Sequence, residues 1–200
     1  AVIAIVTALF INGCGRAKPA EPEYAPKIYA VDQQEKAADA LRKDNLAGAL
    51  DFASKAIAHD PEYPEAYVAK ATALARLGQR QAARDLLTQC LQHRADHADA
   101  NLFRGVLNDE LKDADAARED YKHAAAAYST LLTAKPDDLD HELKYAVAEY
   151  LRAGTPGLRL INALSTKYPE SVPVRFVRDR MVAQDRAFAF RWITGQSPVE

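Results

Sequence analysis

The residues that could carry out chemistry in this chain are few, and none of them forms a known catalytic motif. The sequence has no G-x-S-x-G, P-loop or H-E-x-x-H pattern, and His141-Glu142 continues as Leu-Lys-Tyr. His93, Asp96 and His97 could offer metal ligands, but they straddle a predicted loop that gives them no fixed geometry. We therefore interpret them as solvated turn residues, and we predict no catalytic site, no metal and no cofactor.

A second group of candidate ligands consists of four acidic residues close together in the sequence: Asp137, Asp138, Asp140 and Glu142. Carboxylates at this density could form an oxygen cage for calcium. The same residues precede a segment with helical apolar periodicity, and acids are favoured at a helix N-terminus because of the helix dipole. We interpret them as residues of a helix start.

The first cysteine follows an uncharged apolar stretch at residues 1–11. This stretch is shorter than the roughly 20 residues that span a bilayer, and it suits the apolar part of a secretory signal peptide. Ile11-Asn12-Gly13-Cys14 is similar to a bacterial lipobox, in which the cysteine is lipidated and becomes the new N-terminus. We expect residues 1–13 to be the remaining part of a signal peptide. The open alternative is a buried or membrane-anchoring helix with an incidental cysteine.

The segment after this cysteine, residues 14–31, contains three prolines and predicts an extended tether. At about 3.1 Å per residue it could hold a domain up to roughly 50 Å from a membrane. The lipobox resemblance implies a lipid-anchored protein of the bacterial envelope that faces the periplasm. In the sorting logic of such lipoproteins, Gly15 favours the outer membrane over the inner one.

The overall charge excludes one large class of partners. The 26 basic and 28 acidic residues give a net charge of −2, whereas nucleic-acid binding normally shows as a basic excess. If Cys14 carries lipid, Cys90 has no intramolecular partner for a disulfide. We interpret Cys90 as a buried apolar residue.

The elements that must position these residues show a fixed period. Small residues recur with a step of 34 along the chain: Ala49, Ala83 and Ala117, and again Ala56, Cys90 and Ala124. A repeat of this length is typical of stacked helical hairpins, whose helices approach closely at small residues. One unit has an aromatic at Tyr67, small residues at Ala71 and Ala83, a turn at Gly78 and apolar Leu87.

These positions resemble the tetratricopeptide repeat over about residues 33–134. The resemblance implies an all-α, right-handed superhelical solenoid of stacked antiparallel helical hairpins. Departures are Lys36, Lys70 and Arg104, which stand where the family usually has Leu.

The hairpins are predicted within a repeat region at residues 32–170. Their expected helices are Gln33–Lys43 with Leu46–His59, Pro64–Leu77 with Gln79–His93, a helix after Asp96 with Ala114–Ala134, and a divergent pair that ends with Leu158–Lys167. The helix at Ala114–Ala134 is seven residues longer than the repeat predicts, or about two turns. Residues 171–192 predict one amphipathic helix, from Pro173 to Trp192, that caps the solenoid, and residues 193–200 a tail.

The resemblance also implies a partner site. In tetratricopeptide domains the first helix of each hairpin lines an inner groove. The carboxylate clamp of some members is absent, because the matching positions are Gln34, Ala38, Ala69, Asp99 and Phe103. The expected groove has an apolar surface of Val68, Thr72, Phe103 and Val106 with Asp109 and Glu110 at its rim. Such a groove favours an amphipathic helix or an apolar strand of a protein partner. The alternative is that Phe103 and Val106 only pack against the neighbouring hairpin.

The C-terminal helix is locally basic. Its outward arginines Arg178, Arg186 and Arg191 could contact anionic headgroups if a lipid anchor holds the domain near a membrane.

Three functions follow from these observations. The first is a non-catalytic adaptor on an envelope lipoprotein, with a partner of unknown identity in the groove. The second is a periplasmic module that binds lipid or polymer through the basic helix. The third is a non-catalytic subunit of an envelope enzyme.

Overall fold

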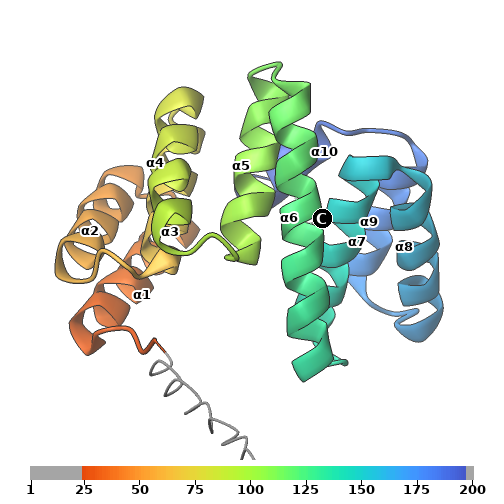
Figure 1. The fold of residues 1–200 in the computed structure, drawn as a ribbon, viewed down its shortest axis with the longest axis horizontal. Helices are drawn as coiled ribbons and strands as arrows, with labels where there is room; N and C mark the ends of the chain where they lie inside the picture. Colours follow the sequence, from red (N-terminus) through yellow and green to blue (C-terminus); the bar gives the residue numbers. More distant parts are fainter. Residues whose placement is uncertain (1–23, 197–200) are drawn as a thin grey trace, which may run out of the picture.

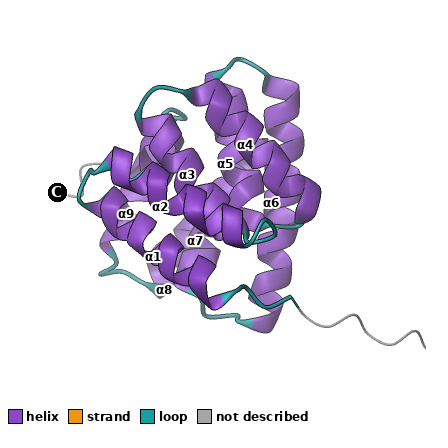
Figure 2. Cartoon of the chain, turned by 90° about the vertical axis from the view of Figure 1, so that its left-hand side faces the viewer, coloured by secondary structure: helices purple, strands orange, loops and turns teal. Residues whose placement is uncertain are grey.

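The computed structural model describes residues 24–196, which contain ten α-helices and no strand. The helices are α1 (Ile28–Arg42), α2 (Leu46–His59), α3 (Pro64–Arg76), α4 (Arg80–His93), α5 (Ala98–Glu110), α6 (Ala114–Ala134), α7 (Leu139–Ala153), α8 (Thr155–Lys167), α9 (Val172–Val182) and α10 (Phe188–Ile193). The first eight form four antiparallel hairpins that stack side by side in chain order (Figure 1). Short loops join them (Figure 2).

The predicted period of 34 is confirmed by the backbone at the turn of each repeat. Asp44, Gly78 and Lys112 lie 34 residues apart, and all three have positive φ angles of 54°, 78° and 68°. A left-handed residue at this point ends the first helix and turns the chain back into the second. Glycine adopts this conformation without steric cost, whereas Asp44 and Lys112 adopt it against the preference of an L-residue.

The start of the first helix differs from the prediction. α1 begins at Ile28, so the last four residues of the predicted 14–31 tether are helical. Asp60, which is 3% exposed, fixes this entry: its Oδ2 accepts from the Tyr24 hydroxyl at 2.8 Å and from the Lys27 backbone N–H at 2.9 Å. The predicted signal segment and Cys14 lie outside the described residues.

The long sixth helix has the predicted bounds. α6 begins after Asp113, whose carboxylate accepts from the Ala116 N–H, and its added turns bury Tyr128 against α5 and α7.

The two helices of the fourth hairpin, α7 and α8, pack at close range, because a Cβ at Gly157 would overlap the backbone of Ala146 and Tyr150 in α7.

The prediction of one C-terminal helix is wrong. The chain forms two helices, with a break at residues 183–187 where Gln184 has a φ of +56°. α9 covers α8 with the buried residues Val174, Val177 and Met181. α10 instead returns to the middle of the solenoid and packs on α5, behind which Figure 1 draws it.

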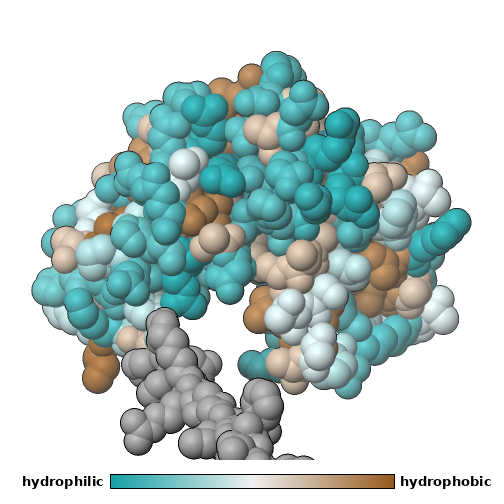
Figure 3. Space-filling view, viewed as in Figure 1, coloured by the Kyte–Doolittle hydropathy of each residue, from teal (hydrophilic) through white to brown (hydrophobic). Residues whose placement is uncertain are grey.

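The main core runs continuously from Tyr67 in α3 to Phe190 in α10. Between α1, α2 and α3 the buried contacts are made largely by alanines, such as Ala37, Ala53 and Ala69. The face shown in Figure 3 is mainly hydrophilic, with separate apolar patches. Among the described helices, none has the length and apolar character needed to cross a membrane.

Candidate partner groove

The predicted groove residues lie on α3 and α5, and α10 packs against α5. We call this surface of α3, α5 and α7 the concave groove. Val68 is partly exposed, whereas Thr72, Phe103 and Val106 are 8%, 1% and 3% exposed. Phe103 and Val106 are both buried in the main core. Part of what covers this core is α10 itself.

α10 contributes apolar side chains to the groove. Phe188 and Phe190 are 0% and 8% exposed, and both belong to the main core cluster. Trp192 is partly exposed, with its ring centroid 6.5 Å from that of Phe188. The short helix is thus held by its aromatic residues.

Two arginines outside α10 also hold it. Arg76 Nε donates to the Thr194 carbonyl at 2.5 Å, and the Arg80 guanidinium lies 4.9 Å from the centre of the Phe190 ring. Sequence reasoning missed this docking. The signal for it was the dense aromatic run Phe188-Ala-Phe-Arg-Trp192, which exceeds what a solvent-facing cap needs.

The two predicted rim acids are both engaged. Asp109 Oδ2 accepts from the Tyr121 hydroxyl at 2.7 Å and from Arg186 Nη2 at 3.1 Å. Glu110 lies 3.3 Å from Arg80 Nε. Tyr121 is buried, and burial together with the Asp109 carboxylate raises the pKa of its hydroxyl. Asp109 therefore ties the linker before α10 to α5.

A cavity of about 250 Å³ remains in the groove beyond the end of α10. Its apolar wall is formed by Val68, Leu102, Phe103, Trp192 and Ile193, and its polar wall by Asp99, Asp140 and Lys144. The cavity lies where α3, α5, α7 and α10 meet, so the groove is occupied at one end and hollow at the other.

The polar wall is a linked set of charges. Lys144 Nζ lies 3.1 Å from Asp99 and 2.7 Å from Asp140, and the buried Tyr128 hydroxyl donates to Asp99. Burial by itself raises the pKa of Asp99, but Lys144 and Tyr128 together hold that pKa below its ordinary value of 3.8. Burial lowers the pKa of Lys144, and the two carboxylates more than reverse this and raise it. Both groups are therefore ionised at neutral pH.

The three predicted anionic-surface arginines are each paired with a carboxylate. Arg178 on α9 contacts Asp179 at 2.8 Å, and Arg191 on α10 contacts Asp185 at 3.0 Å. Arg186, in the linker, contacts Asp109 and also donates to the Leu151 carbonyl at 2.8 Å. The three arginines come from three different segments of the chain. Their contact with a membrane stays a prediction.

The candidate metal ligands have local structural roles. His97 Nδ1 accepts from the Ala100 N–H and caps α5, and Asp138 caps α7 by accepting from the His141 N–H. Among the described residues no group of three or more His, Cys, Asp or Glu side chains is placed to hold a metal ion. The neighbouring acids Asp137, Asp140 and Glu142 contact Lys144 or Lys167. Cys90 is 1% exposed, as predicted, and burial raises the pKa of its thiol to about 12.

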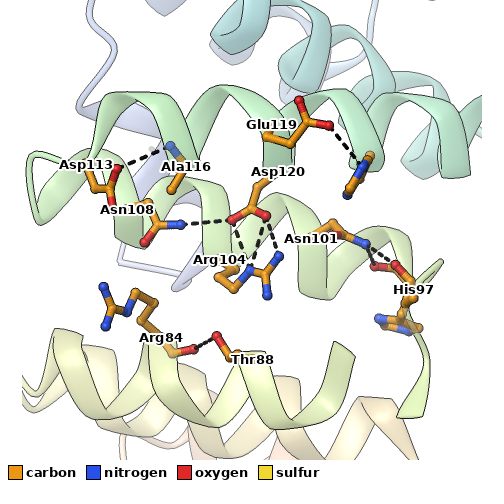
Figure 4. A network of polar contacts seen from close by, with 12 residues as sticks. Arg84, Thr88, His97, Asn101, Arg104, Asn108, Asp113, Ala116, Glu119 and Asp120 are labelled. Atoms are coloured by element: carbon orange, nitrogen blue, oxygen red, sulfur yellow. Dashed lines mark hydrogen bonds and ion pairs between the residues drawn. The ribbon is translucent and has the colours of Figure 1, made fainter. Parts of the chain in front are cut away.

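The departure at Arg104 is explained by a buried polar network between α5 and α6 (Figure 4). Arg104 Nη2 and Nε donate to the Asp120 carboxylate at 2.5 and 3.0 Å, and Asn108 Nδ2 donates to it at 2.9 Å. Asp120 is 4% exposed. An apolar Leu, usual at position 104 in the family, would leave this carboxylate without its countercharge.

The fold of this chain is similar to that of several solved structures. A tetratricopeptide repeat protein from Parabacteroides merdae aligns with 90% of this chain and 66% of its own, with a TM-score of 0.53 and 17% identity. The fold is a tetratricopeptide-repeat solenoid. This likeness shows the fold alone, because the identity is low. No protein-family model matches the chain, and no curated protein matches it in sequence.

Two further solved structures are similar at lower scores. MamA from Desulfovibrio magneticus aligns with 86% of this chain and 94% of its own, with a TM-score of 0.49 and 20% identity. The first repeat domain of human RPAP3 aligns with 72% of this chain and 98% of its own, with a TM-score of 0.48 and 18% identity. Neither likeness carries an argument about partners.

Proposed function

We propose that this protein is a non-catalytic adaptor whose concave groove binds a helical segment of a protein partner. The observation that carries the proposal is that this groove already accommodates a short aromatic helix, α10, and leaves a cavity of about 250 Å³ beside it. Apolar grooves of stacked helices commonly recognise an amphipathic helix through a few anchoring side chains.

Val68 is the position at which to test groove binding. It lines the cavity and lies only at the edge of the main core, so a larger, charged side chain there blocks the groove with little loss of core packing. We expect Val68→Arg to reduce recovery of the partner from detergent-solubilised membranes. Lys70→Glu is the matched control, because Lys70 is also partly exposed and lies about 200° around the same helix. Equal recovery with both variants would contradict the proposal.

We further propose that the adaptor is a lipoprotein of the bacterial envelope, anchored at Cys14 and facing the periplasm, with the outer membrane favoured over the inner one. The support is the apolar segment followed by Ile11-Asn12-Gly13-Cys14. In cells fed an alkyne-labelled fatty acid, the natural chain should become labelled and Cys14→Ser should not. Equal labelling of both chains would contradict the anchor.

A further inference from the structure

The last helix of the structure depends on its contacts for its form. α10 has six residues, and an isolated helix of this length is unstable in water. It follows a linker at residues 183–187 that is largely exposed and contains the left-handed Gln184. Docking into the groove, rather than local propensity, therefore keeps α10 helical.

The contacts of α10 are of the kind that a groove makes with a separate peptide. Phe188 and Phe190 serve as buried anchors, and Arg76 holds the C-terminal end through the Thr194 carbonyl. Arg80 covers the Phe190 ring and is itself held by Glu110. These arginines project from α3 and α4, far from α10 in sequence, so the surface that holds α10 is built from other parts of the chain.

The internal segment does not use the whole groove. Trp192 and Ile193 form one wall of the cavity, and Val68, Leu102 and Phe103 form another. A helix longer than α10 that takes its place would also bury Val68, Leu102 and Phe103. A partner segment can thus gain contacts that α10 lacks.

We propose that α10 is an internal ligand of the concave groove, and that the partner displaces it with a short helix of the same chemistry. That helix carries aromatic side chains at two-residue steps with an arginine among them, as in Phe188-Ala-Phe-Arg-Trp192. This inference rests on the proposed function and names the class of partner segment. Because α10 is tethered, its effective concentration at the groove is on the order of millimolar, and it weakens the apparent affinity of any competitor.

A fluorescein-labelled peptide of residues 185–196 tests this exchange. It is titrated into the full chain and into the full chain with Phe190→Ala and Trp192→Ala, which removes one of the two buried anchors and the aromatic ring next to the other. We expect the double variant to bind the peptide at least about 10-fold more tightly, because the tethered competitor no longer fills the groove. A folded double variant that binds no more tightly than the natural chain would overturn the proposal.

Two controls define where the peptide binds. A peptide with the same two aromatic residues replaced by alanine should bind neither chain. Adding Arg80→Ala to the double variant should weaken binding by about 2- to 30-fold, the range expected for loss of one cation–π contact. Binding that is insensitive to Arg80→Ala and to the alanine peptide would place the peptide outside the groove and overturn the proposal.

If the double variant does not fold, hydrogen exchange of the natural chain tests whether α10 can leave the groove. In the natural chain the Thr194 N–H donates to the Phe190 carbonyl at the C-terminal end of α10, and Leu107 lies in the buried part of α5. Local release of α10 predicts that the Thr194 amide exchanges at least about 100-fold faster than that of Leu107. Equal rates would mean that α10 leaves only when the domain unfolds, which contradicts an exchangeable ligand.

The outcomes for the peptide and for the proposed function are independent. The peptide test measures peptide binding to purified variants at Phe190, Trp192 and Arg80. The proposed function is tested separately, by fatty-acid labelling at Cys14 and by partner recovery with the variant at Val68. A chain that retains labelling and recovery but fails the peptide test is an adaptor with a permanently docked α10. A chain that passes the peptide test but recovers no partner has a competent groove without the proposed role.

Discussion

The buried network between α5 and α6 allows a quantitative prediction. Asp120→Ala removes a carboxylate that is 4% exposed and accepts from Arg104 and Asn108. Removing one partner of a buried ion pair typically costs 3–5 kcal/mol, because the other charge remains uncompensated. The Arg104 side chain is 21% exposed and recovers part of its hydration, so we expect a loss of about 3 kcal/mol. For a domain of this size that loss lowers the melting temperature by roughly 9 °C.

Urea denaturation followed by circular dichroism measures this change against a neighbouring control. Glu119 is the preceding residue of α6, and it contacts Lys122 at 2.8 Å on the exposed surface. Glu119→Ala should change the free energy of unfolding by less than about 0.5 kcal/mol, as is usual for surface pairs.

A double-mutant cycle with Arg104→Leu isolates the ion pair. The combined variant Arg104→Leu with Asp120→Ala should lose less than the sum of the single variants, with a coupling free energy of about 2 kcal/mol. An Asp120→Ala protein that unfolds within about 0.5 kcal/mol of the natural chain, or strictly additive losses, would refute the reasoning.

The remaining predictions concern a turn, a helix contact and a charge pair. Lys112→Gly should increase the free energy of unfolding by about 0.5–1 kcal/mol and so raise the melting temperature slightly, because glycine removes the cost of the left-handed turn at φ 68°. Gly105→Ala should lower stability by about 1–3 kcal/mol, since its Cβ would lie 2.6 Å from the Tyr121 ring, and an unchanged urea midpoint would contradict this packing. Lys144→Met should lower the melting temperature by a constant amount between about pH 5 and 9, and scanning calorimetry over pH checks it. The pKa of Asp99 is depressed in the folded protein, so the difference in melting temperature between the natural chain and the variant should shrink as the pH falls below 3.8. The pKa of Lys144 is raised in the folded protein, so the same difference should also shrink as the pH rises above 10.5.

The repeat architecture could be predicted because its determinants are local and periodic. Small residues at a step of 34 fix where helices touch, and Gly78 marks the turn of the second repeat. The extended α6 was also visible in sequence, since Pro136 arrives seven residues late while the apolar face continues. These features depend on side-chain size and backbone conformation at single positions.

The return of α10 to α5 could not be predicted, because the aromatic run from Phe188 to Trp192 indicates burial but not the helix against which it is buried. The break at residues 183–187 contains neither glycine nor proline, and the apolar spacing from Met181 to Phe188 is compatible with one continuous helix. The chain turns because distant groups hold the segment that follows: Asp109 and the Leu151 carbonyl bind Arg186, and Arg76 binds the Thr194 carbonyl. Such long-range contacts leave no periodic signal in the sequence.

The candidate site could be predicted only in part, because some of its contacts join residues that are far apart in the sequence. Val68 and Phe103, chosen from their repeat positions, line one cavity, and their contact with a partner stays a prediction. Arg104 looked like a departure from the repeat, because its countercharge Asp120 lies on the next helix and is recognised only once α5 and α6 are packed.

The central claim, that the concave groove binds a helical partner segment, is tested most directly by cross-linking in intact cells. A photoactivatable residue at Val68 lies in the cavity, and one at Lys70 lies on the opposite side of α3 at similar exposure. Our account predicts that Val68 cross-links to an aromatic helical segment of an envelope protein, identified by mass spectrometry, and that Lys70 does not. Cross-links from Val68 to α10 alone, or the same products from both positions, would contradict it.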